Sequence, residues 1–528
     1  MKRIIALLIF VNLFLIAQDN NQVELPDFVI IGKRKAQLPT KEKIKPQGSI
    51  FTDDYLKPAI PLSEHKITDF KNLSLEFQKE SKGNIFNNRF EFGLGFYTWP
   101  EVDLIMSKVF KNSYIMARIF GNNEREYISK SGVNQLNASF KYNYLIPNDY
   151  DFLPGSQIFL KTEYDRKISN FFASKYDDVK KESRTIHNFY IDAGWEHKYY
   201  DNFQFLFNIK QNLMFLNNIK NKSYENNLYF DFNPSYKISD VTLNNDLSYS
   251  ATSFNQEDSL VSDNTIMNNT FYANYEFNQN VAIFAGVFLS KAKEPKLFAR
   301  PHLGFIWRTM DRTWIKLNYT PVQKMYTTSN ILENNLYYSL NEKSILETQN
   351  SAYNFTIDYQ YYNFLQNLFS VSYIDYKNYS IFKYNDSLAT FELNNAKVKQ
   401  LTIENTTIYN TGYYGIFTSN LKFNFIKTKD GDKVPFIPFF TLNLFYNYEL
   451  FKNFYIEPKA SLQLKILSDT SQKQSLNNFD LGIKFYYKLG NKLDVFVKFN
   501  NIIDNENYYY YYYRQRKFEI LGGITYSW

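Results

Sequence analysis

The sequence contains no cysteine, and this absence excludes disulfide bonds, thiolate metal sites and a lipid-modified cysteine. Glycine (18 residues) and proline (15 residues) are scarce, so the chain is neither collagen-like nor a low-complexity disordered polymer. A formal net charge of +7 over 528 residues is small, and no compact basic stripe occurs in the sequence, which argues against a nucleic-acid partner. Beyond residue 17 no apolar run reaches the roughly 20 residues that a membrane-spanning helix needs.

The first 17 residues have the organisation of a secretory signal peptide. Lys2 and Arg3 precede an apolar stretch over residues 4–16, and the small residue Ala17 ends it. A membrane-anchor helix is the alternative, but the apolar stretch is too short for one. We therefore expect export with cleavage after Ala17. The lack of cysteine fits an exported chain, although many cytosolic proteins also lack it.

From about residue 88 the hydrophobic pattern has a period of two, which indicates β-strands. In LDVFVKFN (residues 493–500), Leu, Val, Val and Phe alternate with Asp, Phe, Lys and Asn. Such segments recur to the end of the chain, and each has the roughly 9–11 residues of a tilted membrane strand. We predict an all-β chain of about 22 strands. The predicted strands begin near residues 88, 101, 113, 134, 156, 184, 202, 224, 240, 264, 281, 296, 312, 345, 367, 390, 413, 434, 454, 475, 492 and 516.

The length of a predicted connection depends on whether it follows an odd-numbered or an even-numbered strand. Connections after even strands are mostly tight, for example at residues 239–240, whereas those after odd strands are longer and polar, for example at 327–344. Outer-membrane barrels show this asymmetry, with short periplasmic turns and long external loops. A tight turn at Trp99-Pro100 and a longer connection at 147–155 are exceptions. A secreted propeller is the alternative, but it gives no reason for this parity.

The last predicted strand, RKFEILGGITYSW, explains how the sheet would end. In lipid every backbone N–H and C=O must be paired, so a membrane sheet has to close on itself. We therefore predict a closed antiparallel transmembrane β-barrel in the outer membrane of a Gram-negative-type cell. The strand over residues 516–528 would bond to the first, with its apolar side toward lipid and Trp528 at the periplasmic interface. The aromatic content of 19% is explained as two girdles around the barrel.

Several segments resemble the β-barrel region of the TonB-dependent receptors. The segment NNIIDNENYYYYYYRQRKFEILGGITYSW (residues 500–528) is similar to the family's ending, and KTKDGDKVPFIPFFTLNLFYNYEL (427–450) is similar to its loop-then-strand signature. The resemblance covers about residues 88–528 and implies a 22-stranded barrel with a transport role. In that family a plug domain of well over a hundred residues fills the lumen, whereas residues 18–87 supply only 70 here. We therefore expect a relative that lacks a full plug.

The segment between the signal and the barrel contains ELPDFVIIGKRKAQLP (residues 24–39), which resembles the stretch that opens many mature receptors. The resemblance implies that a periplasmic partner of the TonB type binds Asp27, Phe28, Val29, Ile30 and Ile31 by strand addition. A short strand in the lumen or against the periplasmic rim is the alternative. The expected organisation is a signal peptide at 1–17, a periplasmic or lumenal segment at 18–87 and the barrel at 88–528.

A barrel of this size needs something to fill its lumen, because 22-stranded transporters carry a plugged lumen. The candidates are residues 18–87, an external loop folded inward, bulky lumen-facing side chains such as Phe496, or a separate lumen-filling protein. For a transporter, we expect the 327–344 loop and the tyrosine run to capture the ligand. Candidate contacts in that run are Tyr508, Tyr510 and Tyr512, with loop packing as the alternative.

Other functions have less support in the sequence. A passive channel, or a structural or secretion component without energy coupling, remains the main alternative. The four histidines show no hydrolase or paired-ligand spacing, so we predict no enzyme, no catalytic residues and no cofactor. Residues 430–432 (DGD) lack the spacing of a calcium loop, and a hairpin turn explains them better, so no metal site is predicted. The expected partners are outer-membrane lipid and the barrel assembly machinery.

Overall fold

The computed structural model describes residues 88–528, except for the segments 151–152, 175–181, 198–201, 219–221, 257–258, 294–296, 311, 341–343, 362–363, 386–388, 468–474 and 511–512. The expected signal peptide and the segment over 18–87, with Asp27, Phe28, Val29, Ile30 and Ile31, lie outside the described residues. No helix in the described part of the chain is long and apolar enough to cross a bilayer.

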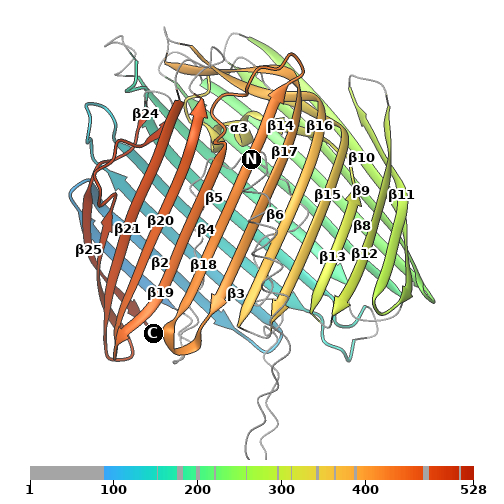
Figure 1. Cartoon of the computed structure of the whole chain (residues 1–528), viewed down its shortest axis with the longest axis horizontal. Coiled ribbons are helices and arrows are strands. Elements are labelled where there is room, and N and C mark those ends of the chain that lie inside the picture. Colours follow the sequence, from blue (N-terminus) through green and yellow to red (C-terminus); the bar gives the residue numbers. More distant parts are fainter. Residues whose placement is uncertain are drawn as a thin grey trace, which may run out of the picture. The chain divides into compact units, whose positions relative to one another are not determined.

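The described elements are almost all strands (Figure 1). In chain order they are β1 (Arg89–Gly95), β2 (Thr98–Val109), β3 (Ser113–Glu124), β4 (Val133–Leu145), β5 (Gln157–Asn170), β6 (Ser183–His197), β7 (Phe203–Asn217), β8 (Lys222–Ile238), β9 (Val241–Gln256), β10 (Ser259–Asn278), β11 (Val281–Ala292), β12 (Phe298–Met310), β13 (Thr313–Tyr319), β14 (Gln323–Thr327), α3 (Thr328–Asn334), β15 (Ser344–Tyr361), β16 (Leu365–Asn385), β17 (Thr390–Asn410), η1 (Gly412–Tyr414), β18 (Ile416–Thr428), β19 (Phe440–Phe451), β20 (Phe454–Leu467), β21 (Ser475–Leu489), β22 (Leu493–Asn500), β23 (Tyr508–Tyr510), β24 (Tyr513–Arg514) and β25 (Glu519–Ser527).

The main sheet is closed. Within it, strands that are adjacent along the chain pair antiparallel, except that β13 and β14 do not pair with each other, and β25 pairs with both β22 and β1, which joins the last strand to the first. The sheet has 23 segments, but β13 and β14 both pair with β15 and are two parts of one interrupted strand. The wall is therefore a barrel of 22 strands, and the predicted fold class is confirmed.

The observed strands begin close to the predicted positions, and the differences have local causes. The strand expected near 434 begins at Phe440, because residues 434–438 are buried and extend the preceding loop. The strand expected near 413 begins at Ile416, after the single turn η1. The tight turn predicted at Trp99-Pro100 is wrong: both residues belong to β2, and the chain reverses just before Thr98.

The alternation along each strand separates an outer face from a lumen face. In β25, Glu519, Leu521 and Thr525 are buried, whereas Ile524 and Tyr526 are about two-fifths exposed on the outside. The outer face carries many exposed aromatic and aliphatic residues, as a surface covered by lipid requires. The turn end of the barrel holds the short connections and Trp528, whose N–H donates to the Asn88 carbonyl at 3.1 Å. The opposite end is called the loop end below.

Candidate functional site

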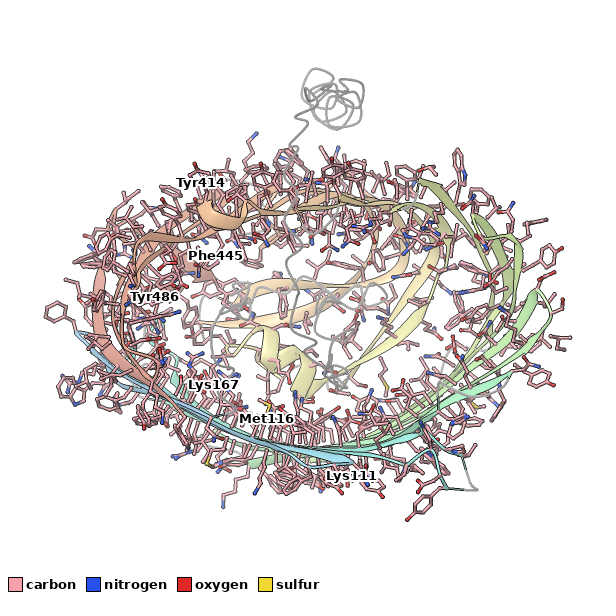
Figure 2. All side chains as sticks on the ribbon, turned by 90° about the horizontal axis from the view of Figure 1, so that it is seen from below. Lys111, Met116, Lys167, Tyr414, Phe445 and Tyr486 are labelled. Carbon is pink, nitrogen blue, oxygen red and sulfur yellow. The ribbon has the colours of Figure 1, made fainter. Side chains whose placement is uncertain are left out.

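Two hydrophobic clusters of the described residues include side chains from residues 323–340. This stretch, called the inner segment, contains β14, α3 and the residues up to Leu340. In the view along the barrel, α3 lies within the ring of strands (Figure 2). The 327–344 loop, which the sequence predicts as an external ligand-capturing loop, therefore turns inward along most of its length.

Local sequence explains why a helix begins at Thr328. The Thr327 side chain accepts a hydrogen bond from the Asn330 N–H, and the Asn330 side chain accepts one from the Thr327 N–H, which forms a capping box. Ile331 and Leu332 then share the buried side of this short helix. The helix ends where the Asn335 N–H bonds to the Ile331 carbonyl.

Glu225 of β8 holds the first turn of α3 from the barrel wall. Its carboxylate is fully buried and accepts hydrogen bonds from the Thr328 N–H at 2.7 Å and the Ser329 N–H at 2.9 Å. The first N–H groups of a helix have no partner within it, so a carboxylate there makes strong charge-assisted bonds. Asn212 and Asn227 add bonds to the Ser329 hydroxyl, each at 3.1 Å. Side chains of β7 and β8 thus supply hydrogen-bond partners for the first turn of α3.

Arg184 of β6 holds the other end of the inner segment. Its guanidinium is buried and donates to the carbonyls of Leu336 and Tyr338, both at 2.7 Å. It also lies over the Phe171 ring, 4.8 Å from the ring centroid. Arginine stays charged in proteins, so this arrangement places a buried cation on backbone oxygens and an aromatic face.

The opposite side of the inner segment is bonded to the β17 hairpin and to the tyrosine run. The Ser339 N–H donates to the Phe391 carbonyl at 2.8 Å, and the Phe391 N–H donates to the Tyr337 carbonyl at 3.0 Å. The Tyr510 hydroxyl donates to the Asn334 carbonyl. The inner segment therefore bridges β6 and β8 on one side and β17 on the other.

The predicted ligand-contact tyrosines have different surroundings. Tyr510 is buried, and Tyr508 is half-buried in the small hairpin of β23 and β24. Tyr512 lies outside the described residues. Tyr513 is fully buried, stacks on Tyr337 with ring centroids 3.4 Å apart and donates to the Ala389 carbonyl at 2.6 Å. Burial raises the pKa of Tyr510 and Tyr513, so both hydroxyls stay protonated and can donate.

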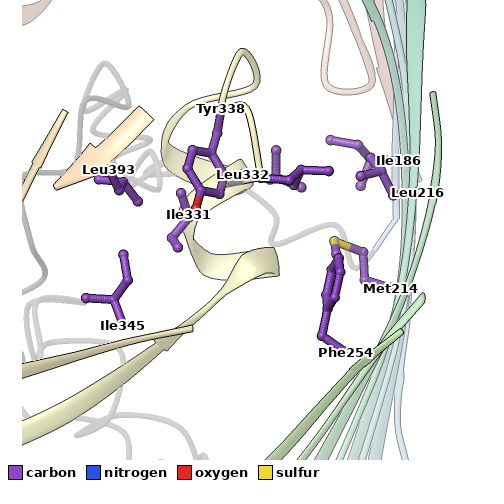
Figure 3. Packing of buried hydrophobic residues seen from close by; sticks show 10 residues of the cluster. Ile186, Met214, Leu216, Phe254, Ile331, Leu332, Tyr338, Ile345 and Leu393 are labelled. Atoms are coloured by element: carbon purple, nitrogen blue, oxygen red, sulfur yellow. The ribbon is translucent and has the colours of Figure 1, made fainter. Parts of the chain in front are cut away.

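Apolar contacts complete the attachment of α3. Leu332 extends toward wall residues of β6, β7 and β9, while Ile331 and Tyr338 lie toward the β15 and β17 side (Figure 3). The wall residues of this cluster are Ile186, Met214, Leu216 and Phe254, and those on the far side are Ile345 and Leu393. All are less than a tenth exposed, so the inner segment and the wall share one hydrophobic core.

A pocket lies between α3 and the loop-end parts of β16 and β17. It has about 550 Å³ of space free of protein atoms, and this figure includes open solvent. Its lining is mostly apolar and includes Tyr326, Ile331, Ile345, Phe382, Leu393 and Val434. Asn330, Asn334 and Ser380 add polar groups at its edge. Such a pocket suits a small, largely apolar molecule with a few hydrogen-bonding groups.

The residues 430–432 form a turn in this structure. The Asp432 N–H donates to the Thr428 hydroxyl at 3.0 Å, and Gly431 has a φ of 94°. That φ lies in the region that favours glycine, so the stretch has the chemistry of a tight turn. Within the described ranges, no group of three His, Cys, Asp or Glu side chains is arranged to hold a metal ion.

The sequence did not single out Glu225 and Arg184. Both occupy lumen-facing positions of strands, and neighbouring lumen positions also carry charges, for example Asp231 and Lys210. The available signal was the start of a helix within 327–344, where Thr327 and Asn330 have capping spacing. A helix there needs a partner for its first N–H groups, but the sequence cannot say which strand supplies it.

No protein-family model and no curated protein matches the sequence. Solved structures match the barrel. The siderophore receptor PiuA from Acinetobacter baumannii is 10% identical with a TM-score of 0.63, over 85% of this chain and 82% of that one. The iron transporter FrpB from Neisseria meningitidis is 12% identical, with a TM-score of 0.62 and the same coverage. The copper transporter OprC is 9% identical, with a TM-score of 0.61 over 85% of this chain and 82% of that one. The described residues therefore have the barrel fold of the TonB-dependent receptors, as the resemblance implied.

Proposed function

We propose that this chain is an outer-membrane transport barrel in which the inner segment is the gate. The observation that carries the proposal is that Glu225 and Arg184, two buried charges of the wall, bond to backbone groups of the inner segment. Burying a charge is costly unless it gains specific partners. A wall that enclosed only water would gain nothing from burying Glu225 and Arg184 in these positions.

The attachment of the inner segment suits a gate that opens in place. The segment is covalently tied to the wall through β13 and β15. Its other contacts are hydrogen bonds and packing in two hydrophobic clusters, one that includes Leu332 and one that includes Tyr337. The pocket beside α3 offers a ligand a position from which to compete with those contacts. A ligand shifts such an equilibrium only by binding the open arrangement more tightly than the closed one.

The structural neighbours support transport over catalysis. They are described as a siderophore receptor, an iron transporter and a copper transporter, in agreement with the prediction that the chain is not an enzyme. We propose transport of a small ligand, and the lining of the pocket favours a largely apolar one. Energy coupling through a TonB-type partner at Asp27–Ile31 is part of this proposal. The second candidate is a passive channel, in which residues 18–35 would be dispensable for passage.

Planar-bilayer conductance of the purified mature protein tests the gate. We expect a low conductance for the wild type and a large, steady conductance after Thr328–Ser339 is replaced by a short Gly-Ser linker. A second variant lacks residues 18–87. If only this second deletion opens the barrel, the inner segment is not the stopper and the proposal fails. If the wild type already conducts steadily, there is no gate.

Ligand uptake by whole cells then separates active from passive transport. Deleting residues 18–35 should abolish uptake against a gradient and leave single-channel conductance unchanged. Unchanged uptake after this deletion would contradict energy coupling and favour the passive channel.

A further inference from the structure

The outer face of β15 to β18 changes abruptly from apolar to basic toward the loop end. The register of these strands sets Tyr353, Tyr373, Leu401 and Phe425 side by side in one row. Two residues further toward the loops, the next outward row reads Ser351, Asp375, Lys399 and Lys427. Residues two apart in a strand lie on the same face, so both rows point outward.

Further lysines lie beyond this row. The Lys429 N–H bonds to the Lys397 carbonyl at 2.8 Å, and Lys433 forms a bridge with Lys427. Lys377 lies at the bulge where β16 meets Lys397 of β17. The six residues Lys377, Lys397, Lys399, Lys427, Lys429 and Lys433, called the lysine patch, are all exposed.

The lysine patch has more positive than negative charge, and its lysines can bind an external anion. Asp375 lies in the row and Asp430 and Asp432 lie in the turn after β18, which leaves a net charge of about +3 for the nine groups. Among the described residues, no ion pair involves any of the six lysines, whereas lumen lysines such as Lys498 and Lys210 contact carboxylates. Like charges gathered without partners repel one another, so an anionic ligand would stabilise the arrangement.

The place of the patch indicates the kind of anion. It borders directly on outward Tyr, Leu and Phe residues, at the level where a membrane strand leaves the apolar part of the bilayer. A soluble anion would gain nothing from those apolar rows. A lipid with a phosphorylated headgroup would use both surfaces, with phosphates on the lysines and acyl chains over Tyr373, Leu401 and Phe425.

We propose that the lysine patch binds the phosphate groups of an outer-leaflet glycolipid of the lipid A type. The site is on the outside of the wall and is separate from the gate in the lumen. The proposal rests on the outer-membrane location and on the orientation with loops outward that the proposed function includes. The lysines are scattered over residues 377–433 in the sequence, and only strand register brings them together.

Binding of lipid A to the full-length mature protein in detergent tests this site. The variant Lys399→Gln/Lys427→Gln/Lys429→Gln removes three neighbouring charges and keeps side-chain length. Its matched control, Lys108→Gln/Lys452→Gln/Lys492→Gln, removes three exposed charges at the turn end. We expect the patch variant to raise the Kd for bisphosphorylated lipid A about tenfold or more, and the control to leave it unchanged. Wild-type binding should weaken with added salt.

Three results would overturn the proposal: equal Kd values for the wild type and the patch variant, equal wild-type affinity for lipid A without phosphates, or displacement of the lipid by millimolar inorganic phosphate. The third result would assign the patch to free anions. The conductance experiments on the gate use bilayers without lipid A, so their outcome is independent of the lipid-binding test. If lipid A binding shows the expected loss while the inner-segment deletion fails to open the barrel, only the proposed gate is wrong.

Discussion

At the scale of single residues, Glu225 shows how one carboxylate can position a whole segment. Both of its oxygens accept N–H bonds from α3, and Oε1 also accepts one from Asn227 at 2.7 Å. A glutamine has one carbonyl oxygen and one NH₂ group in the same space, so it cannot accept from both helix N–H groups. One buried donor would lose its partner, at a cost of about 1–3 kcal/mol.

In the Glu225→Gln variant, the inner segment should therefore leave its closed position more often than in the wild type. We expect the open probability in planar bilayers to rise roughly tenfold or more, with no change in the heat-induced gel shift that reports barrel folding. Asp231→Asn is the control, because Asp231 also faces the lumen from β8 but contacts Lys210 of the wall. Equal open probabilities for both variants would show that Glu225 does not hold the gate.

Two adjacent glycines in β25 differ in what surrounds them. A Cβ added at Gly523 would lie 2.2 Å from the Phe92 carbonyl oxygen and 2.4 Å from the Phe496 ring, whereas one at Gly522 would meet only the Phe496 carbonyl at 3.9 Å. Because Gly523 has no side chain, the ring of Phe496, one of the predicted lumen fillers, can lie against the wall at this position. Phe496 is almost fully buried there, with Tyr486 and Leu521.

Gly523→Val should consequently disturb the junction between β25 and its two neighbours. We expect a lower fraction of heat-modifiable, folded barrel for Gly523→Val, because overpacking costs about 1–3 kcal/mol or more. Gly522→Val on the outer face should fold like the wild type. Comparable folded fractions for the two variants, measured by semi-native electrophoresis, would contradict this account.

At the scale of elements, the strands could be predicted, whereas an external loop folded inward was only one of several candidate lumen fillers and the sequence did not indicate which loop. A strand with lipid on one side and the lumen on the other must alternate, so the period of two reveals its position. The sequence also indicates the 327–344 loop and the tyrosine run as candidate ligand contacts, and this stays a prediction. The direction of α3, however, depends on contacts between residues that are far apart in sequence, 103 positions for Glu225 and Thr328 and 154 for Arg184 and Tyr338. No local pattern encodes those contacts.

Leu332→Ala tests whether packing of α3 on the wall keeps the inner segment closed. Leu332 is 1% exposed, and truncation of such a leucine costs about 2–5 kcal/mol. We expect faster cleavage within residues 328–340 when protease is added to the folded protein. Glu333→Ala, at an exposed position of the same helix, is the control. Cleavage rates that match between the two variants would exclude packing as the restraint.

At the scale of the whole molecule, closure of the barrel depends on pairing between the two ends of the described chain. The seam of β25 and β1 carries seven paired positions on its backbone ladder. Polar side chains reinforce it from the lumen. Lys498 of β22 bonds to Glu91 of β1 at 3.0 Å and to Glu101 of β2 at 2.8 Å, and so links strands on both sides of β25. Across this seam, residues 407 positions apart come into contact.

Lys498→Met should weaken the seam more than a comparable change elsewhere in the wall. Without the ammonium group, Glu91 keeps Arg89 and the more distant Lys484, but Glu101 loses the cation that it shares with Glu91. We expect a lower unfolding temperature in detergent, by roughly 2–4 °C for each kcal/mol lost, because charged hydrogen bonds contribute about 1.5–3 kcal/mol. Lys210→Met is the matched control, since Lys210 contacts the single carboxylate of Asp231 on the adjacent strand, away from the seam. If both variants unfold at the same temperature, the ion pairs at the seam add nothing specific to closure, and backbone pairing of β25 with β1 and β22 is sufficient.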